Sequence, residues 1–281
     1  MEVGVVTRSF PQMDSRQAAA FMARTGFTTT ELCLSQTDSK YWVYNGTSDI
    51  SGLTEKRVAE IADIYRKEGI LVHALGVFTN LIETDPEKLK QNLAYFERHM
   101  EYARAAGIPV VSTECGFDPA SRGIRADLYE SRFTLLLDSL KWLCEKAEKN
   151  GVILALEPCV IDIVPSAKRM ADTIAQVGSN RLKVLLDPAN LIANSSERDM
   201  FAYLSKHVAY FHGKDRKVND AKGRNVGDGE IDWPLFLSLY HRHNEGTPFI
   251  LEYCSADNCG EILRRVREYD RLSAGIQGVK G

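Results

Sequence analysis

The 281-residue sequence has no apolar run long enough to cross a bilayer and no large excess of either charge. Its 35 basic and 38 acidic side chains give a formal net charge of -3. Nucleic-acid enzymes usually concentrate positive charge, so this balance counts against a DNA partner, although a local basic groove is compatible with a neutral total. We therefore expect neither a membrane nor a nucleic acid as partner.

Paired cysteines and a secretory leader are also lacking. The six cysteines are scattered and form no Cys-x-x-Cys pair, which in a chain of this size favours reduced thiols over a disulfide framework. The opening MEVGVVTRSF predicts a strand directly, without the charged head and apolar run of a signal peptide. These absences predict a soluble, cytoplasmic protein.

Short apolar or β-branched runs alternate with amphipathic helical stretches about every 30 to 40 residues, as in βαβ units with a parallel sheet. No glycine-rich phosphate fingerprint follows the first run, and no linker or low-complexity tract marks a second domain. Eight units with no sequence left over predict an α/β fold, a (β/α)8 TIM barrel, with residues 1–281 as one domain. The expected strands are 3–6, 29–34, 71–75, 110–113, 152–156, 182–186, 208–211 and 249–251.

Capping signals mark several of the helices between these strands. Asp85 followed by Pro86 predicts a helix start and Gly107 its end, and Ser166 and Asp232 are expected to cap two later helices. The stretches 35–53 and 214–231 are long for barrel loops. Both follow strands, so they lie at the end of the barrel where active sites are found.

Four expected strands end in a side chain that can bind a metal. Glu157, Asp187, His212 and Glu252 are each the first polar residue after the apolar run of the fifth to eighth strands. Singly, such a carboxylate is more often a helix cap or a rim ion pair, and such a histidine is more often structural. Together, three carboxylates at one rim repel one another unless a cation lies among them. Three oxygens and one imidazole predict one divalent metal ion, with Mn²⁺ as the first expectation and Mg²⁺, Zn²⁺ or Co²⁺ also compatible.

Five motifs extend this pattern. They are Leu156-Glu157-Pro158, Asp187-Pro188-Ala189-Asn190, His212-Gly213-Lys214-Asp215, Val226-Gly227-Asp228-Gly229-Glu230-Ile231-Asp232-Trp233 and Leu251-Glu252-Tyr253. With them the chain resembles, over nearly its whole length, the sugar-phosphate isomerase/epimerase superfamily of xylose isomerase-like TIM barrels. That group includes ketose 3-epimerases, hydroxypyruvate isomerases, inosose dehydratases and AP endonuclease IV nucleases.

The resemblance implies a metal-dependent isomerase or epimerase of a sugar or keto-sugar. By this likeness Glu157, Asp187, His212 and Glu252 bind the metal, and Glu157 and Glu252 are also catalytic. The metal would chelate a carbonyl and a neighbouring hydroxyl and stabilise the enediolate formed when the adjacent carbon loses a proton. One glutamate would remove that proton and the other would return it.

Four further residues are expected to bind substrate. Lys214 follows the histidine ligand, Asn190 stands where the family often has a histidine, Glu114 ends the fourth strand and His73 lies near the end of the third. Each also has a structural interpretation, such as a rim ion pair between Lys214 and Asp215, or an outward-facing register for His73.

Other polar and aromatic residues near the expected rim have a structural interpretation or are candidates for a lid. Glu31 and the turn at Asp228 and Glu230 are interpreted as structural. The rings of Tyr41, Trp42 and Tyr44 in the 35–53 loop are favoured as a lid over a sugar, the alternative being that they only anchor the loop.

Departures from the family pattern leave the substrate open. Ile163 and Val218 stand where ketose 3-epimerases carry a glutamate and an arginine, and Asn190 cannot shuttle a proton. The alternative is a lyase that dehydrates a keto-sugar or inosose through the same deprotonation, with Lys214 or His73 protonating the leaving oxygen.

A third hypothesis, an AP endonuclease-type nuclease, needs a three-metal cluster. Ala221, Gly223 and Asn190 occupy ligand positions of that cluster, which argues against it. The sequence shows no cluster of arginines or lysines for a phosphate, so a free sugar or keto-acid is the expected small sugar-like substrate. The oligomeric state is open, and a homo-oligomer is compatible with the sequence.

Overall fold

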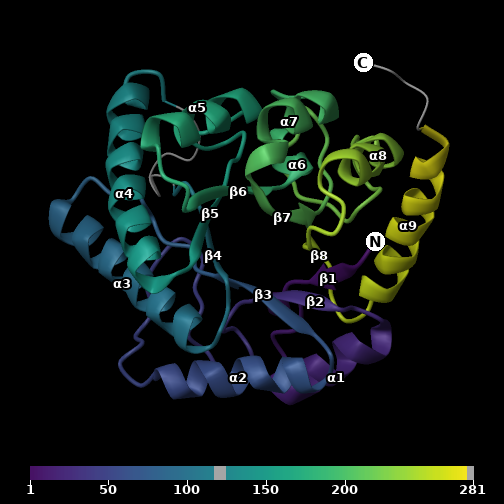
Figure 1. The fold of residues 1–281 in the computed structure, drawn as a ribbon, viewed down its shortest axis with the longest axis horizontal. Coiled ribbons are helices and arrows are strands. Elements are labelled where there is room, and N and C mark those ends of the chain that lie inside the picture. Colours follow the sequence, from purple (N-terminus) through teal and green to yellow (C-terminus); the bar gives the residue numbers. More distant parts are fainter. Residues whose placement is uncertain (117–124, 277–281) are drawn as a thin grey trace.

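The computed structural model describes residues 1–116 and 125–276, and its centre is a closed barrel of eight parallel strands in sequential order (Figure 1). Val3, Gly4 and Val5 of the first strand pair with Phe249, Ile250 and Leu251 of the last, which closes the ring. The predicted TIM barrel is confirmed. The strands are β1 Val3–Val5, β2 Thr29–Leu32, β3 Leu71–Gly76, β4 Val110–Glu114, β5 Ile153–Glu157, β6 Leu182–Leu186, β7 Val208–Gly213 and β8 Phe249–Leu251.

Helices form the outer ring around these strands in Figure 1. The α-helices are α1 Ser15–Thr25, α2 Glu55–Lys67, α3 Pro86–Ala105, α4 Tyr129–Asn150, α5 Ala167–Val177, α6 Pro188–Leu191, α7 Glu197–Leu204, α8 Trp233–His243 and α9 Cys259–Ser273. Short 3₁₀ turns are η1 Thr7–Ser9, η2 Ser205–His207 and η3 Ala274–Ile276. Across the described ranges, none of the helices combines the length and the apolar content that crossing a bilayer would require.

The capping signals have the predicted roles. The Asp85 side chain accepts hydrogen bonds from the backbone N–H groups of Glu87 and Lys88, so it satisfies donors that the first turn of α3 leaves free. Ser166 caps α5 and Asp232 caps α8 in the same manner. Gly107, just beyond α3, has a φ of +64°, the left-handed conformation that glycine adopts without strain.

Apolar side chains pack in two separate layers. The larger lies between the strands and the helices, and the smaller fills the inside of the barrel. Tyr210 is the largest member of the inner group and is completely buried. The inner group is Val6, Ala74, Val110, Ala155, Leu185, Tyr210 and Ile250. It forms an apolar floor, and the polar residues at the ends of the strands lie above it.

Candidate metal centre

The four predicted ligands converge because side chains alternate along a strand. Residues two positions apart point to the same side, so the residue two places after an inner-layer side chain also points into the barrel. The inner-layer residues of β5 to β8 are Ala155, Leu185, Tyr210 and Ile250, and two places later come Glu157, Asp187, His212 and Glu252. One ligand atom from each lies within 4.8 Å of the ligand atoms of the other three.

All four side chains are buried, the most exposed being Glu252 at 4%. Within the described part of the chain, Glu157 Oε2 and His212 Nδ1 have no hydrogen-bond partner, and Asp187 Oδ2 has only the Lys214 ammonium, 2.8 Å away. Buried polar atoms are nearly always satisfied, so such atoms in one cluster indicate a missing partner. Carboxylate oxygens and an imidazole nitrogen are donors that a divalent ion accepts, and the residues present therefore fit one such ion.

Glu31 of β2 fixes the orientation of the His212 imidazole. Its Oε2 lies 2.8 Å from His212 Nε2 and accepts a 2.6 Å hydrogen bond from the Tyr210 hydroxyl. When Nε2 carries the proton, Nδ1 presents a lone pair to the cluster. Histidines that bind metals usually donate their other N–H to a carboxylate or carbonyl oxygen in this way. The structural role expected for Glu31 is therefore to position His212, one of the candidate metal ligands.

Two cations from the chain also reach the cluster. Lys214 Nζ lies 2.7 Å from Glu252 Oε2 and 2.8 Å from Asp187 Oδ2, the second without hydrogen-bond geometry. Arg8, in η1 directly after β1, forms an ion pair with Glu252 Oε1. Lysine and arginine therefore neutralise Glu252 and part of Asp187, but they leave Glu157 Oε2 and His212 Nδ1 unsatisfied.

The charges of the cluster shift its pKa values. Burial alone would raise the pKa of Glu157, but Lys214 and His212 outweigh it and lower that pKa to about 2. Burial alone would lower the pKa of His212, but Glu31 and Glu157 raise it to about 9. At neutral pH and without a metal, His212 is therefore an imidazolium, and a metal that binds Nδ1 must release its proton.

Asn190 connects Glu157 to another arginine, the buried Arg216. Its amide donates a 2.8 Å hydrogen bond to Glu157 Oε1 and accepts one of 3.1 Å from Arg216. Arg216 is 4% exposed, and its Nε and Nη1 have no hydrogen-bond partner. Val218, which stands where ketose 3-epimerases carry an arginine, is 40% exposed and supplies no positive charge. Arg216, two positions earlier in the sequence, places a positive charge beside the site.

Asp215 organises the loop between β7 and α8 and does not pair with Lys214. One of its carboxylate oxygens accepts from the backbone N–H groups of Arg216 and Ile231, and the other from the Gly227 N–H and the Trp233 indole. This arrangement argues against the alternative interpretation of Lys214 and Asp215 as a rim ion pair, because the described hydrogen bonds of the Asp215 side chain go to the loop and Lys214 pairs with other carboxylates. The structural interpretation of the following glycine turn agrees with this arrangement.

The aromatic residues of the 35–53 loop form a wall beside Arg8. Trp42 packs edge-on against Phe78 with ring centroids 5.8 Å apart, and the Arg8 guanidinium lies 5.4 Å from the Trp42 centroid. The Tyr44 hydroxyl donates a 2.6 Å hydrogen bond to Glu114 Oε2. These contacts both anchor the loop and line the rim, so the two interpretations of these rings do not exclude each other.

Glu114 lies close to the cluster, whereas His73 does not. Glu114 pairs in register with Glu157 across β4 and β5, and burial together with Glu157 raises its pKa. His73 is the third of the six residues of β3, whereas the ligands lie at or just beyond the ends of their strands. It contacts the Ala209 carbonyl and the ring of Tyr210, a member of the apolar floor. This position argues against the expected contact of His73 with substrate. The side chain does not face outward, as the alternative register would require, but it lies too far along β3 from the strand ends that carry the ligands.

Arg8 and Arg216 were not among the predicted site residues. The only sequence signal for Arg8 is its place directly after the first strand, on the same rim as the ligands. Arg216 lies in the 214–231 loop that was expected at the active end. Neither contact with the cluster follows from residue spacing, because each depends on how a loop folds back across the rim.

The comparisons with known proteins agree with this architecture. The model of the family described as xylose isomerase-like TIM barrel matches residues 19–271. No curated protein matches the sequence. Similar solved folds include the E. coli 3-keto-D-glucoside 4-epimerase YcjR, 14% identical over 95% of this chain and 99% of that chain, with a TM-score of 0.76.

Two further structures share the fold at similarly low identity. The IOLI protein with a bound zinc atom is 15% identical over 98% of this chain and 99% of that one, with a TM-score of 0.77. A D-psicose 3-epimerase in the presence of D-fructose is 16% identical over 98% of both chains, with a TM-score of 0.70. At these identities the solved structures support the fold alone, whereas the family model covers most of the sequence. The chain belongs to the xylose isomerase-like TIM barrel family.

Proposed function

We propose that the protein is a divalent-metal-dependent isomerase or epimerase of a sugar or keto-sugar. The observation that carries this proposal is the convergence of Glu157, Asp187, His212 and Glu252 above the apolar floor. A bound divalent ion would polarise a carbonyl and a neighbouring hydroxyl and so make the adjacent C–H more acidic. Mn²⁺ is the proposed ion, and Mg²⁺, Zn²⁺ or Co²⁺ also suits these ligands.

Glu157 is the better placed of the two proton-handling carboxylates. Its Oε1 accepts from Asn190, while its buried Oε2 has no hydrogen-bond partner and can take a proton. Both oxygens of Glu252 instead contact cations, Arg8 and Lys214. We therefore assign proton abstraction to Glu157 and the second proton-handling role to Glu252.

The proposed substrate contacts combine polar groups with an aromatic wall. Lys214 and Asn190 lie beside the carboxylates and would orient substrate oxygens, with Arg216 holding the Asn190 amide. Glu114, held by Tyr44, would accept a hydrogen bond from a hydroxyl or donate one. The rings beside Arg8 suit the apolar C–H face of a small sugar.

A lyase that dehydrates a keto-sugar or inosose is the second candidate. It requires an acid that protonates a leaving hydroxyl after the same deprotonation. Glu114 favours this alternative, because burial and Glu157 raise its pKa and so keep it protonated more often than an exposed glutamate. We do not propose His73 as that acid, because it contacts the Ala209 carbonyl and the Tyr210 ring of the apolar floor.

We also propose a class of partner and a location. A buried cluster of single side chains at a barrel mouth suits a small molecule, and we propose no nucleic-acid substrate. All six cysteines are buried free thiols, which accords with a cytoplasmic location.

Proton exchange with solvent tests the proposed function. The Mn²⁺-loaded protein is incubated in D₂O with a panel of keto-sugars and inososes, and the products are analysed by NMR and mass spectrometry. Deuterium next to the carbonyl of recovered substrate or isomer is the expected result, and a dehydrated product would identify the lyase instead. Absence of exchange and of product across the panel, with metal bound, would count against both candidates.

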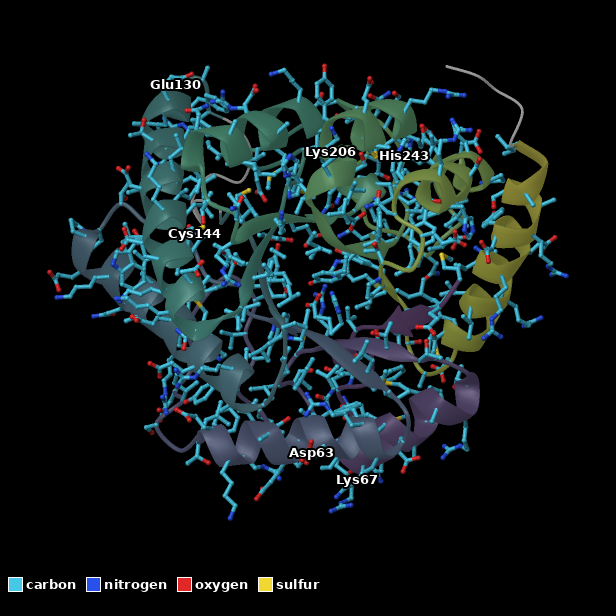
Figure 2. The ribbon with its side chains drawn as sticks, in the orientation of Figure 1. Asp63, Lys67, Glu130, Cys144, Lys206 and His243 are labelled. Carbon is cyan, nitrogen blue, oxygen red and sulfur yellow. The ribbon has the colours of Figure 1, made fainter. Side chains whose placement is uncertain are left out.

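Glu157→Gln should abolish this exchange, since the amide keeps the shape of the side chain but cannot accept the proton. Loss of one catalytic proton-transfer group typically costs about 10²–10⁴-fold in rate. Glu130→Gln is the matched control, because Glu130 is exposed in the first turn of α4, at the outer edge of the molecule (Figure 2). Near-normal exchange by Glu157→Gln would overturn the assignment.

A further inference from the structure

The Lys214 ammonium lies among the same oxygens that would bind the metal. Its Nζ is 2.7 Å from Glu252 Oε2, 2.8 Å from Asp187 Oδ2 and 3.6 Å from Glu157 Oε1. Three of the four candidate ligands thus share one lysine. The side chain is 4% exposed, so water screens these contacts little.

A divalent ion and this ammonium compete for the same oxygens. Carboxylate oxygens bind divalent ions at about 2.0–2.6 Å, so an ion on Asp187 Oδ2 would lie within about 5 Å of Nζ where it now stands. Two positive charges at that separation in a buried site repel strongly. Movement of Lys214 away from at least one of its partners would relieve this repulsion.

The ammonium also has a partner outside the carboxylates. The Tyr253 ring centroid lies 5.2 Å from Nζ, so the lysine makes a cation–π contact while it pairs with Asp187 and Glu252. Tyr253 directly follows Glu252, and 52% of its surface is exposed, so this side of the ammonium opens toward solvent.

The Tyr253 ring is also held in place. Its backbone adopts the left-handed conformation with φ +57°, which is uncommon for a residue other than glycine. The ring packs so closely on Gly223 that a Cβ there would lie 2.5 Å from it. Strained backbone of this kind persists where the surroundings enforce it, often at functional sites.

We propose that Lys214 is an internal counter-cation of the metal centre, one that neutralises the carboxylates in the metal-free protein and moves toward Tyr253 when a divalent ion binds. The inference rests on the proposed function, since it presupposes that the cluster binds a metal. It explains how three buried carboxylates coexist in the metal-free fold. It also places the displaced ammonium at the rim, where it can contact a substrate oxygen.

Mn²⁺ binding to the purified full-length protein tests the inference, with affinity measured by chelator competition and melting temperature measured with and without Mn²⁺. Lys214→Met removes the competing charge and keeps most of the side-chain volume. It should bind Mn²⁺ about 10-fold more tightly than wild type or better, because no ammonium must be displaced. Its metal-free melting temperature should fall, and the rise on adding Mn²⁺ should exceed that of wild type.

Lys206→Met is the matched control for the loss of one positive charge. Lys206 is exposed in η2, which leads into the opposite end of β7 from His212 (Figure 2). Its affinity and melting temperatures should equal those of wild type. If Lys206→Met tightened Mn²⁺ binding as much as Lys214→Met, the effect would be one of net charge and the inference would fail.

Tyr253→Ala provides a second variant whose exposed side chain is not needed for folding the core. A displaced ammonium has fewer carboxylate partners and depends more on the ring, so loss of the ring should weaken Mn²⁺ binding by about threefold, the size of an exposed cation–π contact, while Tyr253→Phe should retain wild-type affinity. Equal or weaker Mn²⁺ binding by Lys214→Met would show that lysine and metal coexist and would overturn the inference alone. If neither wild type nor Lys214→Met bound Mn²⁺, Zn²⁺ or Co²⁺, the proposed function would fall with it.

Discussion

The two nitrogens of His212 have different environments, and this difference decides which one can bind a metal. Nε2 faces Glu31, whereas Nδ1 lies 3.4 Å from Glu157 Oε1 and has no hydrogen-bond partner. The Tyr210 hydroxyl shares Glu31 Oε2 with His212, so the carboxylate is held from two sides. A neutral imidazole with its proton on Nε2 is therefore the form that this site prepares for a metal.

Glu31→Gln tests this arrangement. The substitution replaces a charged acceptor with a neutral amide oxygen, which favours a proton on Nε2 less, and comparable second-sphere changes lower metal affinity by about 10–100-fold. We expect Mn²⁺ affinity, measured by chelator competition, to fall within that range. Tyr210→Phe removes the other hydrogen bond to Glu31 and should have a smaller effect. A Glu31→Gln protein that binds Mn²⁺ as tightly as wild type would contradict the positioning role.

Residues differ in how far the sequence predicts their place in the site. The four ligands are predictable, since each follows an apolar strand by a fixed step and alternation then determines its direction. Arg8 is not, because its contact with Glu252 requires that β1 and β8 be neighbours, which only barrel closure establishes. For Glu31 the sequence predicts the place in the second strand. It does not predict the contact with His212, because that contact crosses the inside of the barrel.

At the scale of elements, the loop between β7 and α8 depends on glycines that let the chain approach closely. A Cβ at Gly229 would lie 2.1 Å from Asp215 Oδ1, so only glycine permits the Asp215 hydrogen bonds that organise the loop. Gly227 has a φ of +88°, and a Cβ there would lie 2.7 Å from the Arg265 and Tyr269 side chains of α9. Close packing at Gly227 and Gly229 thus holds the turn in the loop that carries Lys214 and Arg216.

Gly227→Ala should destabilise the protein through both backbone strain and crowding. Gly246 is the matched control, since it has a φ of +85° but no atom within 4 Å of an added Cβ. Gly246→Ala should therefore lower the free energy of unfolding by about 1 kcal/mol, the cost of a left-handed alanine. Gly227→Ala should lower it by about 3 kcal/mol, because displacing packed side chains adds a comparable amount. Equal losses in urea denaturation would show that crowding contributes nothing.

The sequence predicts strands better than it predicts the helices that follow them. All eight strands overlap their expected ranges, because buried parallel strands are continuous apolar runs. α6 and α7 have no counterpart among the helix boundaries predicted above. Ser196 and Asp199 do form a capping box at the start of α7, so a sequence signal for that helix exists. α6 has only four residues, too short for a hydrophobic stripe to mark it.

At the scale of the whole molecule, closure of the barrel gathers charges that the sequence keeps apart. A net charge of -3 and the scatter of lysines and arginines suggest no cationic cluster. The fold nevertheless brings Arg8, Lys214 and Arg216 to one rim, beside the buried acidic residues. Opposite charges therefore lie side by side at this rim, and net charge alone cannot report such an arrangement.

The stability of the whole molecule should depend on pH through a residue far from this site. His99 of α3 is 3% exposed, lies with Nδ1 2.8 Å from the Tyr95 carbonyl and packs against the Tyr95 and Tyr102 rings. Burial lowers its pKa to about 4, below the value of about 6.5 expected in the unfolded chain. The unfolded state therefore takes up a proton at a higher pH than the folded state does. The corresponding stability is present above pH 6.5 and is lost as the pH falls from 6.5 toward 4.

His99→Gln removes this titration and keeps a side-chain donor for the Tyr95 carbonyl. Between pH 7 and pH 5, the free energy of unfolding of wild type should fall by about 2 kcal/mol more than that of His99→Gln, as the two pKa values require. Urea denaturation at both pH values measures the difference. His243→Gln, which changes an exposed histidine (Figure 2), should follow wild type at each pH. If wild type and His99→Gln lost stability in parallel, protonation of His99 would not drive acid unfolding, and the carboxylates of the barrel rim would be the next groups to replace.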